Sequence, residues 1–173
     1  GYKRGIDGDS GGMNSVINNN YVYVRNTDDW QDAWGIICHD CEIQADTIYI
    51  WGINNDDQTV RGIRADRSKI TDCYIEAYKQ YQDSGGQLFA IESYGNVSNR
   101  SHIIRNSIIA NRYSSAIWAS YAYIEENIIS STSGNYQWSI GNGDYNVIKN
   151  NVITDMQDGI YCYQRKDNVI TSN

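Results

Sequence analysis

The sequence predicts an all-β fold in which the chain winds as a parallel β-helix, a solenoid of about six to seven coils. Three observations support this prediction. Apolar anchor positions recur at intervals of about 20 to 34 residues along most of the 173-residue chain, which is a repeat length typical of solenoids. The apolar stretches are short and rich in β-branched and aromatic residues, as strands are. The chain also contains no proline, which would remove donors from a strand ladder.

The first set of anchors follows one rule in six segments. An isoleucine is followed by three mostly polar residues and one variable residue, and then by a second Ile or Val. The predicted first anchors are Ile17, Ile43, Ile70, Ile104, Ile124 and Ile148, and their partners are Val22, Ile48, Ile75, Ile109, Ile129 and Ile153. Asparagine recurs between the two anchors, where its amide can bond to equivalent residues of neighbouring coils. We therefore expect a turn with stacked asparagines at this point of each coil.

A second anchor lies between consecutive pairs, usually after a small residue. These anchors are Ile36, Ile63, Ile91, Ile117, Ile140 and Ile160. Residues 1–13 are assigned to a flexible lead-in, or to the end of a preceding segment, and residues 14–173 to the solenoid. No capping element follows Ile170, and solenoids normally need one, so a fragment of a longer chain is expected.

The spaced Ile and Asn elements and the repeated Gly-Ile pairs resemble the right-handed parallel β-helix superfamily of pectate-lyase-like proteins. Within it, the chain is most similar to bacteriophage tailspike and polysaccharide depolymerase domains. The resemblance covers residues 14–173. It implies a right-handed helix, a polysaccharide or surface glycan as partner, a homotrimer, and a location outside the cell or on a virion surface.

The same resemblance implies no cofactor, apart from Ca²⁺ if the chain is a lyase. Oxygen ligands for Ca²⁺ would come from carboxylates. The candidates are Asp28, Asp29, Asp32, Asp56 and Asp57.

Charge and hydropathy exclude other classes of partner. The formal net charge is −7 and the pI is about 4.7, whereas nucleic acids and anionic membrane surfaces require a basic face. No apolar run approaches the ~18 residues of a membrane-spanning helix. We therefore expect neither nucleic-acid binding nor membrane insertion. The chain also opens without a secretory leader pattern.

The segment GDSGG at residues 8–12 resembles the peptide that carries the nucleophilic serine of chymotrypsin-like proteases, but over these five residues only. Those enzymes place a histidine and an aspartate before the serine. Both histidines of this chain, His39 and His102, follow Ser10. The segment is therefore interpreted as part of a glycine-rich lead-in.

The segment CHDC at residues 38–41 contains two of the four cysteines. Cys38 falls two residues after an anchor and is expected to pack inward, whereas Cys41 and Cys73 fall near turns. A metal site and a redox pair are the alternatives, although no second CxxC completes a zinc set. The irregular spacing of the cysteines argues against a disulfide scaffold.

The candidate functional site lies on the strands of the second anchors. Side chains alternate along a strand, so the residues one and three positions after each anchor should point outward. The first outward column contains Ile37, Arg64, Glu92, Trp118, Gly141 and Tyr161, and the second contains His39, Asp66, Tyr94, Ser120, Gly143 and Tyr163. Aromatic rings can stack on the apolar faces of sugars, and carboxylates can accept hydrogen bonds from hydroxyl groups. This mixture therefore suits a glycan groove.

Asp66 and Glu92 are predicted as the catalytic acid and base of such a groove. They lie on adjacent coils, and their diagonal separation of roughly 8 Å overlaps the range used in glycoside hydrolysis. The predicted substrate-binding residues are Arg64, Tyr94, Trp118, Tyr161, Tyr163 and His39. The structural alternative is a set of charge and aromatic pairs on an exposed sheet. Insertions at 25–34, 54–61 and within 70–104 would wall the groove, and could bring Trp30, Trp34, Tyr78 and Tyr81 to the ligand.

The other outward face offers two further features. Tyr21, Tyr23, Tyr49 and Tyr74 accompany Glu76 in the early coils and form a possible second binding strip. In the later coils, Ile108, Ile128 and Val152 are predicted to form an exposed apolar stripe. Such a stripe is unusual on a solvated surface. We expect a homotrimer to bury it, the alternative being a loop of the same chain.

Two classes of function therefore remain open. The first is an enzyme that cleaves glycans, either a glycoside hydrolase or, if the substrate is a uronate, a lyase. A lyase needs a basic residue near the scissile bond, and Arg61, Arg64, Arg67 and Lys69 cluster in one coil. The second class is a non-catalytic shaft or adhesin that binds surface glycan.

Overall fold

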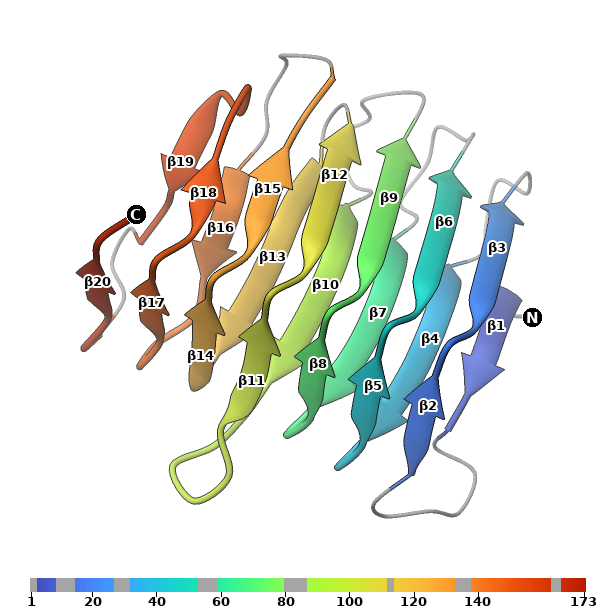
Figure 1. The fold of residues 1–173 in the computed structure, drawn as a ribbon, viewed down its shortest axis with the longest axis horizontal. Coiled ribbons are helices and arrows are strands. Elements are labelled where there is room, and N and C mark those ends of the chain that lie inside the picture. The colour runs from blue at the N-terminus through green and yellow to red at the C-terminus, as the bar shows by residue number, and fades with distance from the viewer. Residues whose placement is uncertain are drawn as a thin grey trace.

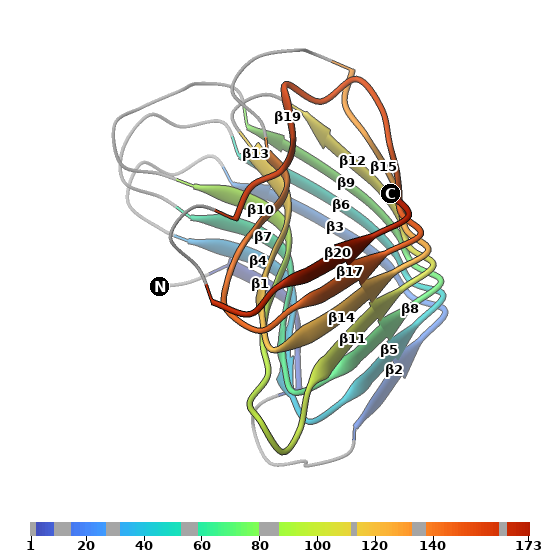
Figure 2. The same cartoon turned by 90° about the vertical axis from the view of Figure 1, so that its left-hand side faces the viewer.

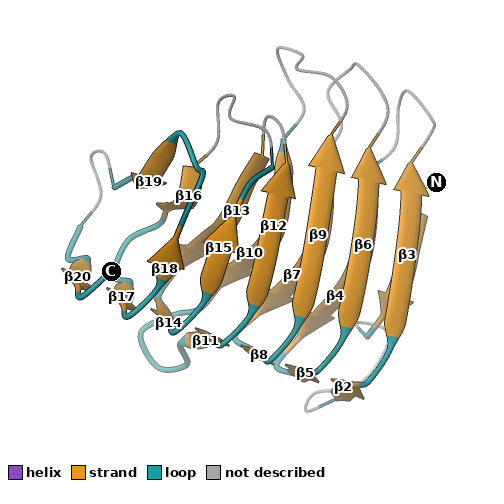
Figure 3. Cartoon of the chain, turned by 45° about the horizontal axis from the view of Figure 1, so that its top comes forward, coloured by secondary structure: helices purple, strands orange, loops and turns teal. Residues whose placement is uncertain are grey.

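The computed structural model describes residues 3–8, 15–26, 32–52, 59–79, 87–111, 114–132, 138–162 and 166–173. These residues form three sheets, called sheets A, B and C, and include no helix, hence none that could cross a membrane (Figure 3). Sheet A contains β1 (Lys3–Asp7), β4 (Ala33–His39), β7 (Val60–Asp66), β10 (Leu88–Tyr94), β13 (Ser114–Ser120), β16 (Trp138–Asn142) and β19 (Asp158–Ile160). Sheet B contains β2 (Val16–Asn18), β5 (Glu42–Gln44), β8 (Lys69–Thr71), β11 (Ser101–Ile104), β14 (Ala122–Glu125), β17 (Val147–Lys149) and β20 (Val169–Thr171). Sheet C contains β3 (Tyr21–Asn26), β6 (Thr47–Gly52), β9 (Tyr74–Lys79), β12 (Ser107–Asn111), β15 (Ile128–Ser130) and β18 (Val152–Ile153).

Each coil contributes one strand to each sheet, in the order B, C and A, and strands of neighbouring coils pair in parallel. In Figure 1 the strands of sheets B and C run upward on the near side, and those of sheet A run downward on the far side. Successive coils advance from right to left in the same view, which makes the helix right-handed. Figure 2 shows the coils one behind another. The predicted right-handed parallel β-helix is therefore confirmed.

The extent of the solenoid differs slightly from the prediction. Five coils have three strands of at least three residues each, and β18 has only two residues, so the count is below the predicted six to seven. The solenoid also begins earlier than residue 14. Lys3–Asp7, which was assigned to the lead-in, forms β1 and pairs with β4, and Ile6 lies beside Ile36. Residues 9–14, including Ser10, lie outside the described ranges.

The core consists of isoleucines stacked coil upon coil. The second anchors lie in register as predicted, in the order Ile36, Ile63, Ile91, Ile117, Ile140 and Ile160. Most of them are fully buried. Burial of one such side chain contributes about 1.5–3 kcal/mol, so this repeated column is a main source of stability.

The first-anchor prediction is wrong in one coil. Ile103 and Ile108 are the inward residues there and are 0% exposed, whereas Ile104 and Ile109 are half-buried. Both anchors of this coil are pairs of adjacent isoleucines, so the apolar pattern fits either register. A shift of one residue moves a side chain to the other face of a strand. Ile108 is consequently a core residue and does not belong to the apolar stripe.

Two of the three predicted residues of the apolar stripe remain exposed, and a serine occupies the position of the third. Ser107, Ile128 and Val152 lie opposite one another on β12, β15 and β18. Ile128 is 57% exposed and Val152 is 55% exposed. The outer face of sheet C therefore presents two exposed apolar side chains in line, rather than three.

A buried asparagine ladder occupies the turn between sheets B and C. The backbone N–H of Asn106 donates to Asn127 Oδ1 at 2.9 Å, and that of Asn127 donates to Asn151 Oδ1 at 3.0 Å. The predicted stacking of asparagines is thus confirmed. Asn150, directly before a ladder residue, instead has a φ of 56°, a left-handed conformation that asparagine tolerates.

Candidate functional site

The outer face of sheet A presents described members of both predicted columns in the predicted register. Arg64 pairs with Glu92, and Glu92 pairs with Trp118, on successive strands. In the second column, His39 pairs with Asp66. Parallel strands lie about 4.8 Å apart, so these side chains are immediate neighbours along the solenoid.

A third outward column lies nearer the start of each strand and was not predicted. It contains Trp34, Arg61, Phe89, Ser115 and Trp138. These residues lie two positions before the anchors, so strict alternation would point them into the core. Instead, the anchor and the small residue directly before it both face the core, and the residue before that pair faces outward. A Cβ added at Gly35 would collide with the carbonyl oxygen of Gly62 and the buried side chain of Ile48. The small residue before each anchor was therefore the signal for a local break in the alternation.

Glu92 is the centre of the polar part of this face. Its side chain is only 6% exposed, and it is paired with Arg61 Nε and with Arg64 Nη1, the latter at 2.6 Å. The hydroxyl of Tyr94 donates to Glu92 Oε1 at 3.1 Å. Three donors from two neighbouring strands therefore hold one buried carboxylate.

Asp66 is linked to Glu92 through the same arginine. Arg64 Nε lies 3.2 Å from Asp66 Oδ1, and Nη2 donates to Asp66 Oδ2 at 3.2 Å. The backbone N–H of Tyr94 also donates to Asp66 Oδ1 at 3.0 Å, and His39 Nδ1 lies 3.4 Å from Asp66 Oδ2. The structure thus brings the two predicted carboxylates together on either side of one guanidinium group.

The arginines determine the protonation state of Glu92. Burial raises the pKa of a carboxyl group, but the charges of Arg61 and Arg64 outweigh burial here and hold the Glu92 pKa below its ordinary value. Burial, with the adjacent Glu92 carboxylate, raises the pKa of Tyr94 to about 12. Glu92 is therefore ionised and Tyr94 is neutral at neutral pH. An ionised Glu92 can accept a proton, but it has none to donate as a general acid.

An aromatic row continues this face toward the C-terminal coils. The ring of Trp118 lies 5.7 Å from that of Phe89 and 6.0 Å from that of Trp138, centroid to centroid. Tyr161 then stacks on Trp138 at 4.8 Å with an interplanar angle of 5°. A Cβ at Gly141 would lie 2.6 Å from the Trp118 ring, so the absence of a side chain at this position leaves room for the ring.

The other predicted contributors are dispersed or not described. Tyr78 lies on sheet C, where its ring contacts Trp51 at 4.4 Å. Arg67 and Lys69 pair with Asp40 and Glu42, so the predicted cluster of four cations is divided between two faces. The predicted residues outside the described ranges are Tyr163, Trp30, Tyr81, Asp28, Asp29, Asp56 and Asp57.

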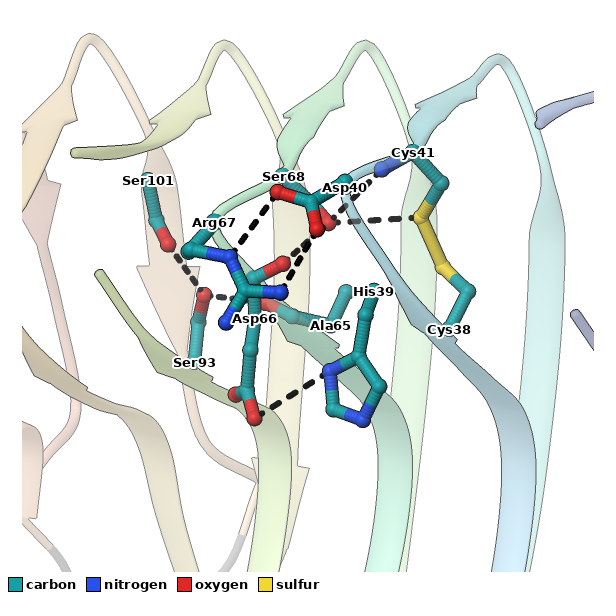
Figure 4. The surroundings of a disulfide bond; sticks show 10 residues. All are labelled: Cys38, His39, Asp40, Cys41, Ala65, Asp66, Arg67, Ser68, Ser93 and Ser101. Atoms are coloured by element: carbon teal, nitrogen blue, oxygen red, sulfur yellow. Dashed lines mark hydrogen bonds and ion pairs between the residues drawn. A yellow bond between two sulfur atoms is a disulfide. The ribbon is translucent and has the colours of Figure 1, made fainter. Parts of the chain in front are cut away.

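Cys38 packs inward and Cys41 lies at the turn after β4, both as predicted, but the two cysteines also form a disulfide across that turn (Figure 4), which was not predicted. Their Cα atoms are 6.3 Å apart, a separation that a disulfide can span. The Cys41 N–H donates to Ser68 Oγ at 3.1 Å in the next coil. The CxxC spacing was the relevant signal, because it lets one tight turn join both thiols.

Within the described ranges, no group of three or more His, Cys, Asp or Glu residues could hold a metal ion. Asp32, one of the predicted Ca²⁺ ligands, instead lies 3.3 Å from Arg61 Nη1. It also accepts a hydrogen bond from the Thr59 N–H at 2.8 Å. Asp32 is the one predicted Ca²⁺ ligand within the described ranges, so the Ca²⁺ site stays a prediction.

No protein-family model matches the chain, and no curated protein or solved structure matches it.

Proposed function

We propose that the outer face of sheet A binds glycan. The observation that carries this proposal is the aromatic row from Phe89 to Tyr161, which adjoins the Arg61, Arg64, Glu92 and Asp66 cluster on the same face. A β-helix fold is compatible with glycan binding or degradation. A row of aromatic rings that runs from the buried Phe89 to the exposed Tyr161, beside a cluster of ion-paired side chains, also differs from an ordinary solvated face.

Each part of this face offers a different contact to a sugar chain. The rings of Trp118, Trp138 and Tyr161 offer apolar surface for the C–H faces of sugar rings, and they lose little side-chain entropy on binding. Arg64 is paired with Glu92 and Asp66, and its guanidinium lies 4.6 Å from the centre of the Tyr94 ring, so this cluster offers charged donors and acceptors to sugar hydroxyl groups. A glycan several sugars long would contact both parts.

The test is binding to a panel of capsular and plant polysaccharides, followed by calorimetry on any positive ligand. We expect Tyr161→Ala to weaken binding by about tenfold, equivalent to 1.4 kcal/mol, because it removes the exposed end of the row. Tyr123→Ala removes a partly exposed tyrosine from sheet B and serves as the control. Equal affinity of the Tyr161→Ala variant and the parent chain would reject sheet A as the binding face.

Glycan cleavage is the second candidate, as in a phage tailspike depolymerase. The observation that favours it is the fixed, ionised state of Glu92, which suits a base or a nucleophile, with Asp66 as the second carboxyl group. Hydrolysis would then need Asp66 to donate the proton. If cleavage occurs, Glu92→Gln abolishes release of reducing ends and leaves glycan affinity within about tenfold. Unchanged turnover removes Glu92 from the mechanism.

The proposed location is extracellular or on a virion surface, and the proposed assembly is a homotrimer. A disulfide persists in oxidising compartments, so the Cys38–Cys41 bond supports a location outside a reducing cytoplasm. The exposed Ile128 and Val152 support contact with a partner copy, because burial of apolar side chains favours association.

A further inference from the structure

The outer face of sheet C has a small cleft that the proposed glycan site does not use. It occupies about 170 Å³ and lies between the strands β3, β6 and β9, which stand in the front row of Figure 3. The residues that line it are Tyr23, Tyr49, Ile50, Trp51, Glu76 and Tyr78. Four of the six carry aromatic rings, and one carries a carboxylate.

Strand register explains how these side chains surround one space. Tyr23, Tyr49 and Glu76 lie side by side in one outward column of sheet C. Trp51 and Tyr78 lie side by side in the next outward column, two residues further along the strands. Side chains two residues apart on a strand share a face. The cleft is therefore bounded by an aromatic column on each side, with Glu76 at one end.

Two of the rings are exposed to solvent, and the rings of Trp51 and Tyr78 are tilted relative to each other. Tyr23 is 56% exposed and Trp51 is 41% exposed. The rings of Trp51 and Tyr78 are 4.4 Å apart and tilted by 46°, so they form a corner rather than a flat stack. A rounded group can contact both faces of a corner at once, whereas a flat ring contacts only one.

The charge of the cleft selects among possible ligands. Glu76 is the one acidic or basic residue among those that line it, and its Oε2 accepts a hydrogen bond from the hydroxyl of Tyr74 at 3.2 Å. Arg25 stands beside Trp51 on β3 but does not line the cleft. The face of an aromatic ring carries partial negative charge. A carboxylate and several ring faces therefore favour a cation over a neutral sugar or an anion.

We propose that this cleft binds a quaternary ammonium group of the choline type. A trimethylammonium ion is rounded, weakly hydrated and positively charged, and aromatic rings recognise it through cation–π attraction. Glu76 supplies the opposite charge. The same chemistry occurs in free choline, in phosphocholine carried on a glycan or lipid, and in trimethyllysine.

The first experiment is calorimetric titration of the full chain with choline. We expect saturable binding of one choline per chain. The matched ligand is 3,3-dimethylbutan-1-ol, which has the same shape but a carbon atom in place of the charged nitrogen. We expect it to bind at least about tenfold more weakly, the factor that corresponds to 1.4 kcal/mol. Equal binding of the two ligands, or the absence of saturable choline binding, would overturn the proposal.

Two variants then locate the site. Tyr23→Ala should weaken choline binding by about fivefold, and Glu76→Gln by about tenfold. Tyr123→Ala and Glu126→Gln, on other parts of the surface, are the matched controls and should bind choline like the parent chain. Tyr23 is exposed, so its loss should leave the circular dichroism spectrum unchanged. Choline binding that is insensitive to both cleft variants would place the ligand elsewhere and reject the cleft.

Parallel titrations distinguish the sources of the group. Phosphocholine, phosphatidylcholine vesicles and a trimethyllysine peptide present the same cation on different carriers, and the carrier bound most tightly identifies the class of partner. The proposal is independent of glycan binding on sheet A, because Tyr161→Ala and Tyr23→Ala affect different faces. If neutral oligosaccharides bind in a Tyr23-dependent manner and choline does not bind, the cleft is a second glycan strip and the proposal fails.

Discussion

The substitution Glu92→Gln tests whether the polar cluster on sheet A contributes substantially to the free energy of unfolding. In the native chain the Glu92 side chain is 6% exposed and contacts Arg61, Arg64 and the Tyr94 hydroxyl. A glutamine has nearly the same shape. It removes the charge, however, and can place an NH₂ group against one of the two guanidinium groups.

The expected loss of stability depends on the carboxylate partners that Arg61 and Arg64 retain in the variant. Loss of one partner from a buried ion pair destabilises proteins by about 3–5 kcal/mol. Arg64 retains Asp66 at 3.2 Å and Arg61 retains Asp32 at 3.3 Å, and neither arginine is fully buried. The partners therefore offset part of the loss, and we expect the free energy of unfolding to fall by about 2–3 kcal/mol.

The pH dependence gives an independent signature of the same interaction. Because Arg61 and Arg64 hold the Glu92 pKa below its ordinary value, Glu92 contributes stability that is fully present above its unfolded pKa of about 4.3. That contribution is lost as the pH falls through the lower, folded pKa. The parent chain should therefore lose its advantage over Glu92→Gln on acidification below about pH 4.3.

Urea unfolding followed by circular dichroism measures both effects. Glu42→Gln is the matched control, because Glu42 also forms an ion pair, with Lys69 at 2.7 Å, but both side chains are substantially exposed. It should change stability by less than about 0.5 kcal/mol. A loss for Glu92→Gln no larger than that of the control, or a constant difference across the acidic range, would refute the assigned role of the cluster.

Three further predictions concern the ladder, the stripe and the cysteines. Asn127→Ala removes four buried hydrogen bonds and should lower the unfolding free energy by about 3–5 kcal/mol in urea titrations, whereas Asn99→Ala in an exposed turn should cost less than about 0.5 kcal/mol. Ile128→Lys should dissociate a homotrimer at micromolar concentration by light scattering; a parent chain that is already monomeric contradicts the trimer. Cys73 is buried with its pKa raised to about 12, so a thiol reagent at pH 8 should label the partly exposed Cys162 first, and faster labelling of Cys73 would contradict its burial.

The sequence alone determined the fold class, because the solenoid depends on a repeating pattern of few residues. Isoleucines at fixed offsets mark the inward face of every coil, and most of their register was predicted correctly. The same pattern predicted which residues share the outer face of sheet A, including Arg64, Glu92 and Trp118. Alternation along a strand is local, and it can therefore be followed from sequence.

Only the tertiary structure decided the features that depend on contacts between coils. The register of residues 103–109 was ambiguous, since adjacent isoleucines satisfy either face. It is fixed by Asn106, whose buried amide must meet Asn127 in the next coil.

The charge states of the site also depend on contacts between coils, whereas the pairing of the cysteines depends on the conformation of one turn. Glu92 is a predicted catalytic group by position, but two arginines from the neighbouring strand make it a buried, ionised partner. Whether Cys38 and Cys41 face each other is set by the turn that joins them. Pattern fixes which way a side chain points, whereas its partners, burial and pKa depend on distances that arise only when the coils stack.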